Sequence, residues 1–222
     1  MTAVLTLDDM HQVARGKQRA VFLHPSDDSK LIKVLRKTAD LTGRSAFNLM
    51  TERWFPSLRL RNIRKEYLEY LRVMLSNPQP EFQPPVSHMY GFVSTNLGLG
   101  CVTEKIVGDN GGLADTLKTL LIEDRLTDRH LDLLNETIRR LFDLDIRASD
   151  LTARNFVFGH RLIGGYSDAE ERVVVDGFGD VHAVPVRSMA KWSNRLGLDD
   201  SCKRLAKNNK LHWDSRTRQI SR

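Results

Sequence analysis

Hydrophobic and polar positions alternate over two stretches near the start of the chain, and this pattern predicts a hairpin of two strands. The strands are expected at about 18–25 and 30–35, with the polar run at 26–29 as the turn. A second hairpin is predicted from the apolar positions of 87–95 and 100–107, which flank a short polar and glycine-containing turn. Hairpins of this kind favour an antiparallel sheet in the first half of the chain.

Helical spacing of apolar residues appears between the two hairpins and again after the second one. Asn62 to Leu75 is predicted to be a helix with one broad apolar face. The face consists of Ile63, Tyr67, Tyr70, Leu71, Met74 and Leu75. After the glycine-rich residues 108–112, helices are expected at 113–123 and 128–142, the second capped by Thr127 or Asp128. Short strands at 156–158 and 173–175 follow.

The order of these elements predicts an α+β protein with two small lobes. Residues 1–107 would form an N-lobe with an antiparallel sheet and one long helix, and residues 108–186 a reduced helical C-lobe. Residues 187–222 are expected to form a basic helical tail that packs on the C-lobe or extends it. A chain of 222 residues, 41% of them hydrophobic, is long enough to bury a substantial core.

The excess positive charge of the chain is confined to this tail. Residues 187–222 contain ten Lys or Arg and three Asp, a net +7, whereas the preceding residues contain 24 basic and 25 acidic residues, a net −1. A basic tail is suited to an anionic partner such as nucleic acid, a membrane surface or an acidic substrate. The alternative that we favour is a solvated basic face on a helix packed through Trp192, Leu205 and Trp213.

Composition also bears on the compartment. No apolar stretch approaches the roughly 18 residues that a membrane span requires. The first ten residues include two acids and lack the basic region and apolar run of a signal peptide. Cys101 and Cys202 are too few for a disulfide framework. We therefore expect a cytoplasmic protein without a membrane span.

Two polar motifs in the second half predict the chemistry. Asp150 is followed five residues later by Asn155, and Asp176 comes directly after three valines and before Gly177-Phe178-Gly179. Phosphoryl transfer needs one carboxylate at the accepting hydroxyl, and an amide oxygen and a second carboxylate on magnesium. We predict Asp150 as the catalytic base, with Asn155 and Asp176 as Mg²⁺ ligands. The alternative is that these side chains only cap turns.

A phosphotransferase of this type also needs a lysine to hold the ATP phosphates. Lys33 alternates with Ile32 and Val34 on a predicted strand, so it is expected on the opposite face from them. The alternative is a solvated strand lysine. Glu66, at the edge of the apolar face of the predicted helix, is the expected partner of Lys33. The competitors are Glu52 and the interpretation that Glu66 is an exposed helix charge.

Glu69 is expected to point further toward solvent than Glu66. Closer to the N-terminus, Gly16, Lys17 and Arg19 occupy the place of a phosphate-covering turn. An ordinary basic turn remains the alternative there.

The segment 101–106 occupies the place of an adenine-binding hinge, in which main-chain groups of Glu104 and Ile106 would bind the base. An ordinary amphipathic strand predicts the same residues.

These motifs together resemble the PhoP regulatory network protein YrbL family, which consists of bacterial protein-kinase-like proteins. The residues that carry the resemblance are Gly16-Lys17-Gln18-Arg19, His24-Pro25, Ile32-Lys33-Val34, Lys65-Glu66-Tyr67, Tyr90-Gly91-Phe92-Val93-Ser94-Thr95, Gly98-Leu99-Gly100, Asp150-Leu151, Asn155 and Asp176-Gly177-Phe178-Gly179-Asp180, followed by the basic tail. The resemblance implies a compact bilobal protein-kinase-like fold and the binding of ATP and Mg²⁺.

Two departures from ordinary protein kinases narrow the expected activity. Ala148-Ser149 stand where those enzymes have His-Arg, so activation through a phosphorylated loop is not expected. Only 46 residues follow Asp176, and they contain no Ala-Pro-Glu segment. The expected function is a kinase that acts on a small hydroxyl compound, a sugar or itself rather than on a peptide. The alternatives are a pseudokinase that only binds nucleotide and, third, a nucleic-acid-binding regulator that acts through the tail.

Overall fold

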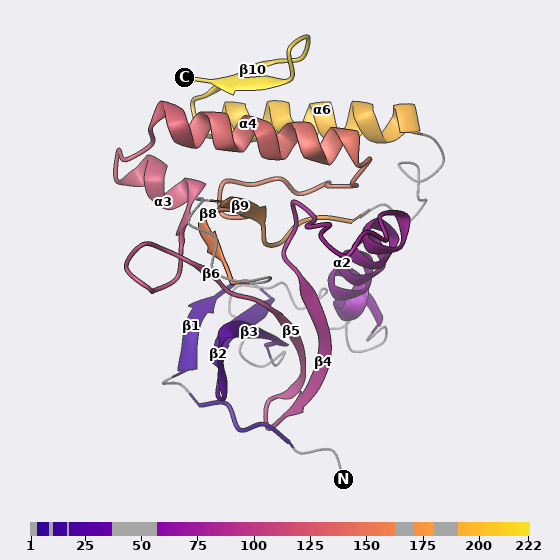
Figure 1. Cartoon of the computed structure of the whole chain (residues 1–222), viewed down its shortest axis with the longest axis vertical. Helices are drawn as coiled ribbons and strands as arrows, with labels where there is room; N and C mark the ends of the chain where they lie inside the picture. The colour runs from indigo at the N-terminus through magenta and orange to yellow at the C-terminus, as the bar shows by residue number, and fades with distance from the viewer. Residues whose placement is uncertain (1–3, 9–10, 17, 37–56, 163–170, 180–190) are drawn as a thin grey trace, which may run out of the picture. The chain divides into compact units, whose positions relative to one another are not determined.

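The computed structural model describes residues 4–8, 11–16, 18–36, 57–162, 171–179 and 191–222 (Figure 1). The chain divides into two compact units. The first consists of Met1–Leu60, His88–Lys105 and Leu162–Gly164, and the second of Arg61–Ser87, Ile106–Arg161 and Gly165–Arg222.

The described part of the first unit contains a five-stranded antiparallel sheet with the order β1-β2-β3-β5-β4 (Figure 1). Its strands are β1 (Gln12–Arg15), β2 (Arg19–His24), β3 (Asp27–Leu35), β4 (Met89–Thr95) and β5 (Gly98–Glu104). Both predicted hairpins are confirmed. The first turn is shorter than predicted, since it occupies only Pro25 and Ser26, and β3 already begins at Asp27. The Asp27 carboxylate accepts the Ser29 N–H at 3.0 Å, a local bond of the kind that Asp and Ser also form in turns, so these residue types alone do not exclude a turn here.

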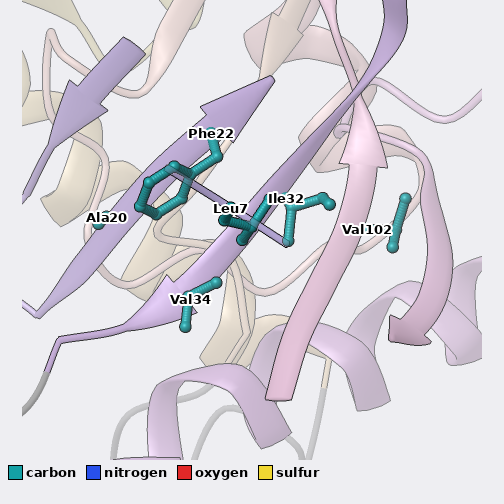
Figure 2. Close-up of a cluster of buried hydrophobic side chains, with 6 residues drawn as sticks. All are labelled: Leu7, Ala20, Phe22, Ile32, Val34 and Val102. Carbon is teal, nitrogen blue, oxygen red and sulfur yellow. The ribbon is translucent and has the colours of Figure 1, made fainter. Parts of the chain in front are cut away.

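One face of this sheet carries the core of the first unit (Figure 2). The buried cluster consists of Leu7, Ala20, Phe22, Ile32, Val34 and Val102. The strand register explains its composition, because Ala20 pairs with Val34, and Phe22 with Ile32, so that these side chains leave the sheet on the same side. β3 therefore buries its alternate residues Ile32 and Val34 here.

The predicted helix is confirmed as α2 (Ser57–Ser76), although it begins five residues earlier than expected. Its predicted apolar face is partly wrong. Tyr70 is buried, but Leu71 and Leu75 are 37% and 79% exposed. The buried stripe instead contains Glu66, Glu69 and Val73, which follow one another at helical spacing. Hydrophobicity alone misplaced the inner face, because two of its residues are charged.

The described helices of the second unit after α2 are α3 (Leu117–Ile122), α4 (Asp128–Asp143) and α6 (Lys191–Asn208). The start of α4 is confirmed at Thr127, whose hydroxyl accepts the His130 N–H at 3.3 Å in a capping box. α3 starts four residues later than predicted. Thr116 caps it, and Asp115–Thr116 is a short strand, β7, that pairs with β8.

Short antiparallel strands around β8 (Phe156–Arg161) form the central sheet of the second unit. β6 (Ile106–Val107), β7 and β9 (Glu171–Val174) all pair with β8. The predicted strand at 100–107 is thus interrupted at Lys105, where β5 of the first unit ends and β6 of the second unit follows. The predicted α+β class with an antiparallel N-terminal sheet is confirmed.

The described part of the tail is folded into the second unit. Leu198, Cys202 and Leu205 of α6 are buried. β10 (His212–Asp214) and β11 (Gln219–Ser221) form a hairpin, in which Trp213 Nε1 donates to Asp199 Oδ1 at 3.0 Å. Packing through Leu205 and anchoring through Trp213 agree with the favoured interpretation. The interpretation is wrong for Trp192, which is 69% exposed.

Among the residues that the structure describes, none of the helices combines the length and the apolar character needed to cross a membrane.

Candidate functional site

The loop that follows Asp150 is closed by main-chain and amide hydrogen bonds. Asn155 Nδ2 donates to the Asp150 carbonyl oxygen at 3.0 Å, and the Asn155 N–H donates to the Thr152 carbonyl at 2.9 Å. The Asp150 carboxylate belongs to an exposed residue. Asp150 and Asn155 thus share one tight loop in which the amide side chain of Asn155 braces the backbone of Asp150.

The loop that follows Asp176 is bound directly to the Asp150 loop. The Asp150 N–H donates to the Gly177 carbonyl at 3.2 Å, and the Val175 N–H donates to the Asn155 carbonyl at 2.9 Å. Asp176 Oδ1 accepts the Gly177 N–H at 2.8 Å. These bonds bring the three residues predicted for base catalysis and metal binding, Asp150, Asn155 and Asp176, into one cluster of loops.

Strand pairing explains why two motifs about twenty residues apart meet. β8 and β9 are antiparallel, with Phe156 paired to Val174. Both residues are fully buried, so the register is fixed by the core. Asn155 precedes the first residue of β8, and Asp176 lies two residues beyond the last residue of β9. An antiparallel pair places the start of one strand beside the end of the other, and hence Asn155 beside the Asp176 loop.

Oxygen donors from Asn155 and Asp176 fit a magnesium ion. The Asn155 Nδ2 is used by the Asp150 carbonyl, which orients the amide and directs Oδ1 away from that bond. The described residues contain no group of three or more His, Cys, Asp or Glu that could hold a metal by themselves. Mg²⁺ usually binds through one or two carboxylates, with waters and substrate phosphates supplying the rest, so the Asp176 carboxylate with the Asn155 amide oxygen is compatible with such a site.

In the first unit, Lys33 lies on the sheet face opposite the buried cluster. Lys33 pairs in register with Val21 on β2 and with Cys101 on β5, so these three residues project from the same face. Lys33 is only 8% exposed. The opposite orientation of Lys33 relative to Ile32 and Val34 was predicted from alternation, and the register agrees with it.

Sequence reasoning missed Thr103 on this face. Thr103 lies two residues after Cys101 on β5 and therefore points to the same side as Lys33. Thr103 is buried, and among the described residues its Oγ1 has no hydrogen-bond partner. A buried hydroxyl without a partner is costly in a folded protein, so a water or a ligand at this face would find a hydrogen-bonding group in Thr103. A threonine in a strand gives no such signal in the sequence.

The predicted phosphate-covering turn is closed by its own backbone. The Gly16 N–H donates to the Arg19 carbonyl at 2.8 Å, and Arg36 Nη1 donates to the Gly16 carbonyl at 3.2 Å. The Gly16 amide is therefore already used within the turn. Lys17 lies outside the described residues. The phosphate contacts of Gly16, Lys17 and Arg19 stay predictions.

The two residues predicted to present main-chain groups to adenine belong to different units. In the first unit, Glu104 Oε1 accepts the His88 N–H at 2.7 Å, and the Glu104 N–H donates to the His88 carbonyl at 3.0 Å. In the second unit, the Ile106 carbonyl accepts the Ala114 N–H at 3.1 Å, so this oxygen is already paired. The adenine contacts of both residues stay predictions.

Both glutamates of α2 are buried, and only Glu69 is placed differently from the prediction. Glu66 is 3% exposed, so the interpretation as an exposed helix charge is wrong. Glu52 lies outside the described residues, and the choice between it and Glu66 as the Lys33 partner stays open. Glu69 was expected closer to solvent but is 2% exposed. Its carboxylate binds Arg72 and Arg147, and only the first of these partners is near it in sequence.

The family comparison covers nearly the whole chain. The family described as PhoP regulatory network protein YrbL matches residues 5–210. The chain belongs to this family. The matched residues include every candidate residue of both units, from Gly16 to Asp176. The match confirms the resemblance found in the sequence.

Comparison with solved structures finds similarity to WbdD. In its co-crystal structure with the kinase inhibitor LY294002, the identity is 14% and the TM-score is 0.45, over 78% of this chain and 34% of the WbdD chain. A second WbdD structure gives 13% identity and a TM-score of 0.45, over 81% and 35%. The chain thus spans about a third of the WbdD chains that it matches. No curated protein sequence matches it.

Proposed function

We propose that this protein is an ATP- and Mg²⁺-dependent phosphotransferase that transfers a phosphoryl group to a hydroxyl acceptor. The observation that carries the proposal is the hydrogen-bonded cluster of loops in which Asp150, Asn155 and Asp176 meet. Each has the chemical character that its role requires. A turn-capping role alone would not need an exposed carboxylate on Asp150 beside an oriented amide and a second carboxylate.

Asp150 is proposed as the residue that orients the acceptor hydroxyl and takes its proton. An exposed carboxylate can reach a substrate, and its loop is fixed from both sides by the bonds to Asn155 and Gly177. Asn155 and Asp176 are proposed to hold Mg²⁺, which would neutralise the charge that develops on the transferred phosphoryl group. The protein then contributes mainly positioning and electrostatic stabilisation.

Lys33 is proposed to hold the ATP phosphates as a point charge. Its low exposure and its place on a sheet face that also carries the unpaired Thr103 hydroxyl support a ligand-binding role for this face of the first unit. Glu66 is proposed to brace Lys33. Gly16, Lys17 and Arg19 are proposed phosphate contacts, and main-chain groups of Glu104 and Ile106 are proposed adenine contacts.

A small hydroxyl compound, a sugar or the protein itself is the proposed acceptor. Ala148 and Ser149 replace the usual His-Arg pair, and both have structural roles here. Ala148 is buried and bridges to Phe178, and the Ser149 hydroxyl donates to the Gly179 carbonyl at 3.1 Å. These residues therefore brace the Asp176 loop rather than read a phosphorylated activation segment.

A second candidate function is a regulatory nucleotide-binding module that does not turn ATP over. The observation in its favour is the Gly16 turn, whose amide is committed to Arg19 and is not free to bind a phosphate. This alternative predicts nucleotide binding without ATP consumption, whichever hydroxyl compounds are supplied.

Binding of Mg²⁺ and ATP can be tested by thermal unfolding. We expect ATP with Mg²⁺ to raise the melting temperature of the wild type, and the shift to be lost in Asp176→Asn. Asn retains the oxygen that accepts the Gly177 N–H but lacks the charge. Asp132→Asn, at an exposed position of α4, is the matched control and should retain the full shift. An equal shift in Asp176→Asn would contradict the metal role, and a shift without ATP consumption would favour the second candidate.

A further inference from the structure

Glu69 of α2 is a buried carboxylate whose position in the second unit is fixed by two arginines. Arg72 Nη2 donates to Glu69 Oε1 at 2.6 Å, and Arg147 Nη1 donates to Glu69 Oε2 at 3.2 Å. The Arg147 backbone N–H also donates to Glu69 Oε1, at 2.8 Å. A buried charge is costly unless it is paired and hydrogen-bonded, so this network must persist for α2 to keep its packing.

Arg147 extends this network to both loops of the candidate site. It lies three residues before Asp150, and its carbonyl oxygen accepts the Gly179 N–H at 2.6 Å. Gly179 lies three residues after Asp176. Arg147 thus donates to the Glu69 carboxylate and, through its carbonyl oxygen, also accepts a hydrogen bond from the Asp176 loop.

The α2 backbone also approaches the Asp176 loop directly. Gly179 has φ +91°, and a Cβ at this position would lie 2.6 Å from the Lys65 carbonyl oxygen. Lys65 and Glu69 are one helical turn apart and therefore lie on the same side of α2. Helix α2 consequently contacts the Asp176 loop at Lys65 and, through Glu69, binds Arg147, which lies three residues before Asp150.

Arg72 strengthens the same attachment. Its Nη2 also donates to the Asp145 carbonyl at 2.8 Å, in the turn between α4 and Arg147. Burial alone would lower the pKa of Arg72, but the hydrogen bonds and charge of Glu69 outweigh this effect and raise it. The Arg72 guanidinium therefore remains charged beside the Glu69 carboxylate.

We propose that Glu69 is a positioning residue that fixes the Asp150 and Asp176 loops in place relative to each other and to α2. The proposal rests on the phosphotransferase function proposed above. Glu69 does not touch substrate in this account and acts through Arg147. Its loss should lower kcat, because small displacements of catalytic groups are costly, while nucleotide affinity should change little.

The test compares Glu69→Gln with Glu136→Gln, in which a partly exposed glutamate of α4 loses a long ion pair to Arg139. Gln at position 69 retains an oxygen for the Arg147 N–H but removes the charge that binds both arginines. Amide hydrogen exchange is measured over 147–150 and 177–179 in each variant. We expect exchange to rise about tenfold in both loops of Glu69→Gln and to be unchanged in Glu136→Gln.

The kinetic readout is the split between kcat and KM. Glu69→Gln should reduce kcat about 10- to 100-fold and leave KM for ATP within about threefold. If Glu69→Gln does not fold, Arg147→Met is used instead, because that change keeps both backbone bonds of residue 147. Unchanged exchange in both loops would overturn the proposal, as would increased exchange with wild-type kcat.

A wild type that consumes no ATP would refute the phosphotransferase proposal instead. In that case the exchange measurement still decides whether Glu69 holds the two loops. The two failures are therefore distinguishable.

Discussion

Gly177 lies so close to Asp150 that a Cβ on Gly177 would lie 2.3 Å from the Asp150 carbonyl oxygen. The same Cβ would lie 2.5 Å from Asn155 Nδ2. Gly177 also has φ +79°, a conformation that side chains with a Cβ rarely adopt. The contact between the Asp150 and Asp176 loops is therefore possible only with glycine at this position.

Gly177→Ala is expected to push the two loops apart. Gly111 offers a matched control, because it has φ +76° but open space around its missing Cβ. Gly111→Ala should lower the free energy of unfolding by about 1–2 kcal/mol through backbone strain alone. Gly177→Ala should cost about 1–3 kcal/mol more from the steric clash and should reduce ATP turnover. Urea unfolding measures both, and equal effects of the two changes would contradict the tight loop contact.

Sequence patterns predicted the candidate residues of each unit and part of their placement, because the relevant signals are local. The two motifs at Asp150 and Asp176 could be paired from their spacing, and alternation along β3 placed Lys33 opposite Ile32. The antiparallel pairing of β8 with β9 then supplies the physical reason why the motifs meet. Each of these inferences needed only residues that are near one another in the chain.

The parts that sequence reasoning missed depend on distant partners. Glu69 could be placed near solvent because the inner side of a helix is usually apolar, whereas here Arg147, 78 residues away, makes burial of its charge tolerable. Because the buried side of α2 contains Glu66 and Glu69, Leu71 and Leu75 lie on the exposed side of the helix. The unpaired hydroxyl of Thr103 likewise depends on its surroundings rather than on its neighbours in sequence.

Arg161 is expected to be important for stability because it is fully buried in β8 and binds the connector, the segment between α2 and β4. Its Nη1 donates to the Pro84 carbonyl at 2.7 Å, and its Nη2 donates to the Val86 carbonyl at 3.4 Å. Arg161→Met would leave these carbonyls without their donors and should lower the free energy of unfolding by about 2–5 kcal/mol.

The control for Arg161 is Arg139→Ala on α4, where the side chain is 62% exposed and pairs with Asp143 at 3.1 Å. Loss of this surface ion pair should change stability by less than about 1 kcal/mol. Urea denaturation followed by circular dichroism gives both values. A similar small effect of Arg161→Met would show that the buried guanidinium does not hold the connector.

Cys202 reports whether the tail helix is packed in solution. Its side chain is fully buried in α6, and burial, together with the charge of Asp199, raises the pKa of the thiol well above its ordinary value. Because only the thiolate reacts, Cys202 should resist alkylation at pH 8 in the native protein and react fully in denaturant. Mass spectrometry assigns the modified cysteine. Rapid labelling of native Cys202 would contradict the packing of α6.

ATP consumption by the wild type and by Asp150→Asn tests the central claim most directly. Asn at position 150 keeps the backbone bonds to Gly177 and Asn155 but cannot accept a proton from the acceptor hydroxyl. We predict Mg²⁺-dependent turnover in the wild type, with sugars, small alcohols or the protein itself as acceptor. The variant should be at least about 100-fold slower with its Mg²⁺-dependent thermal shift preserved. Turnover that is unchanged in Asp150→Asn would contradict the account.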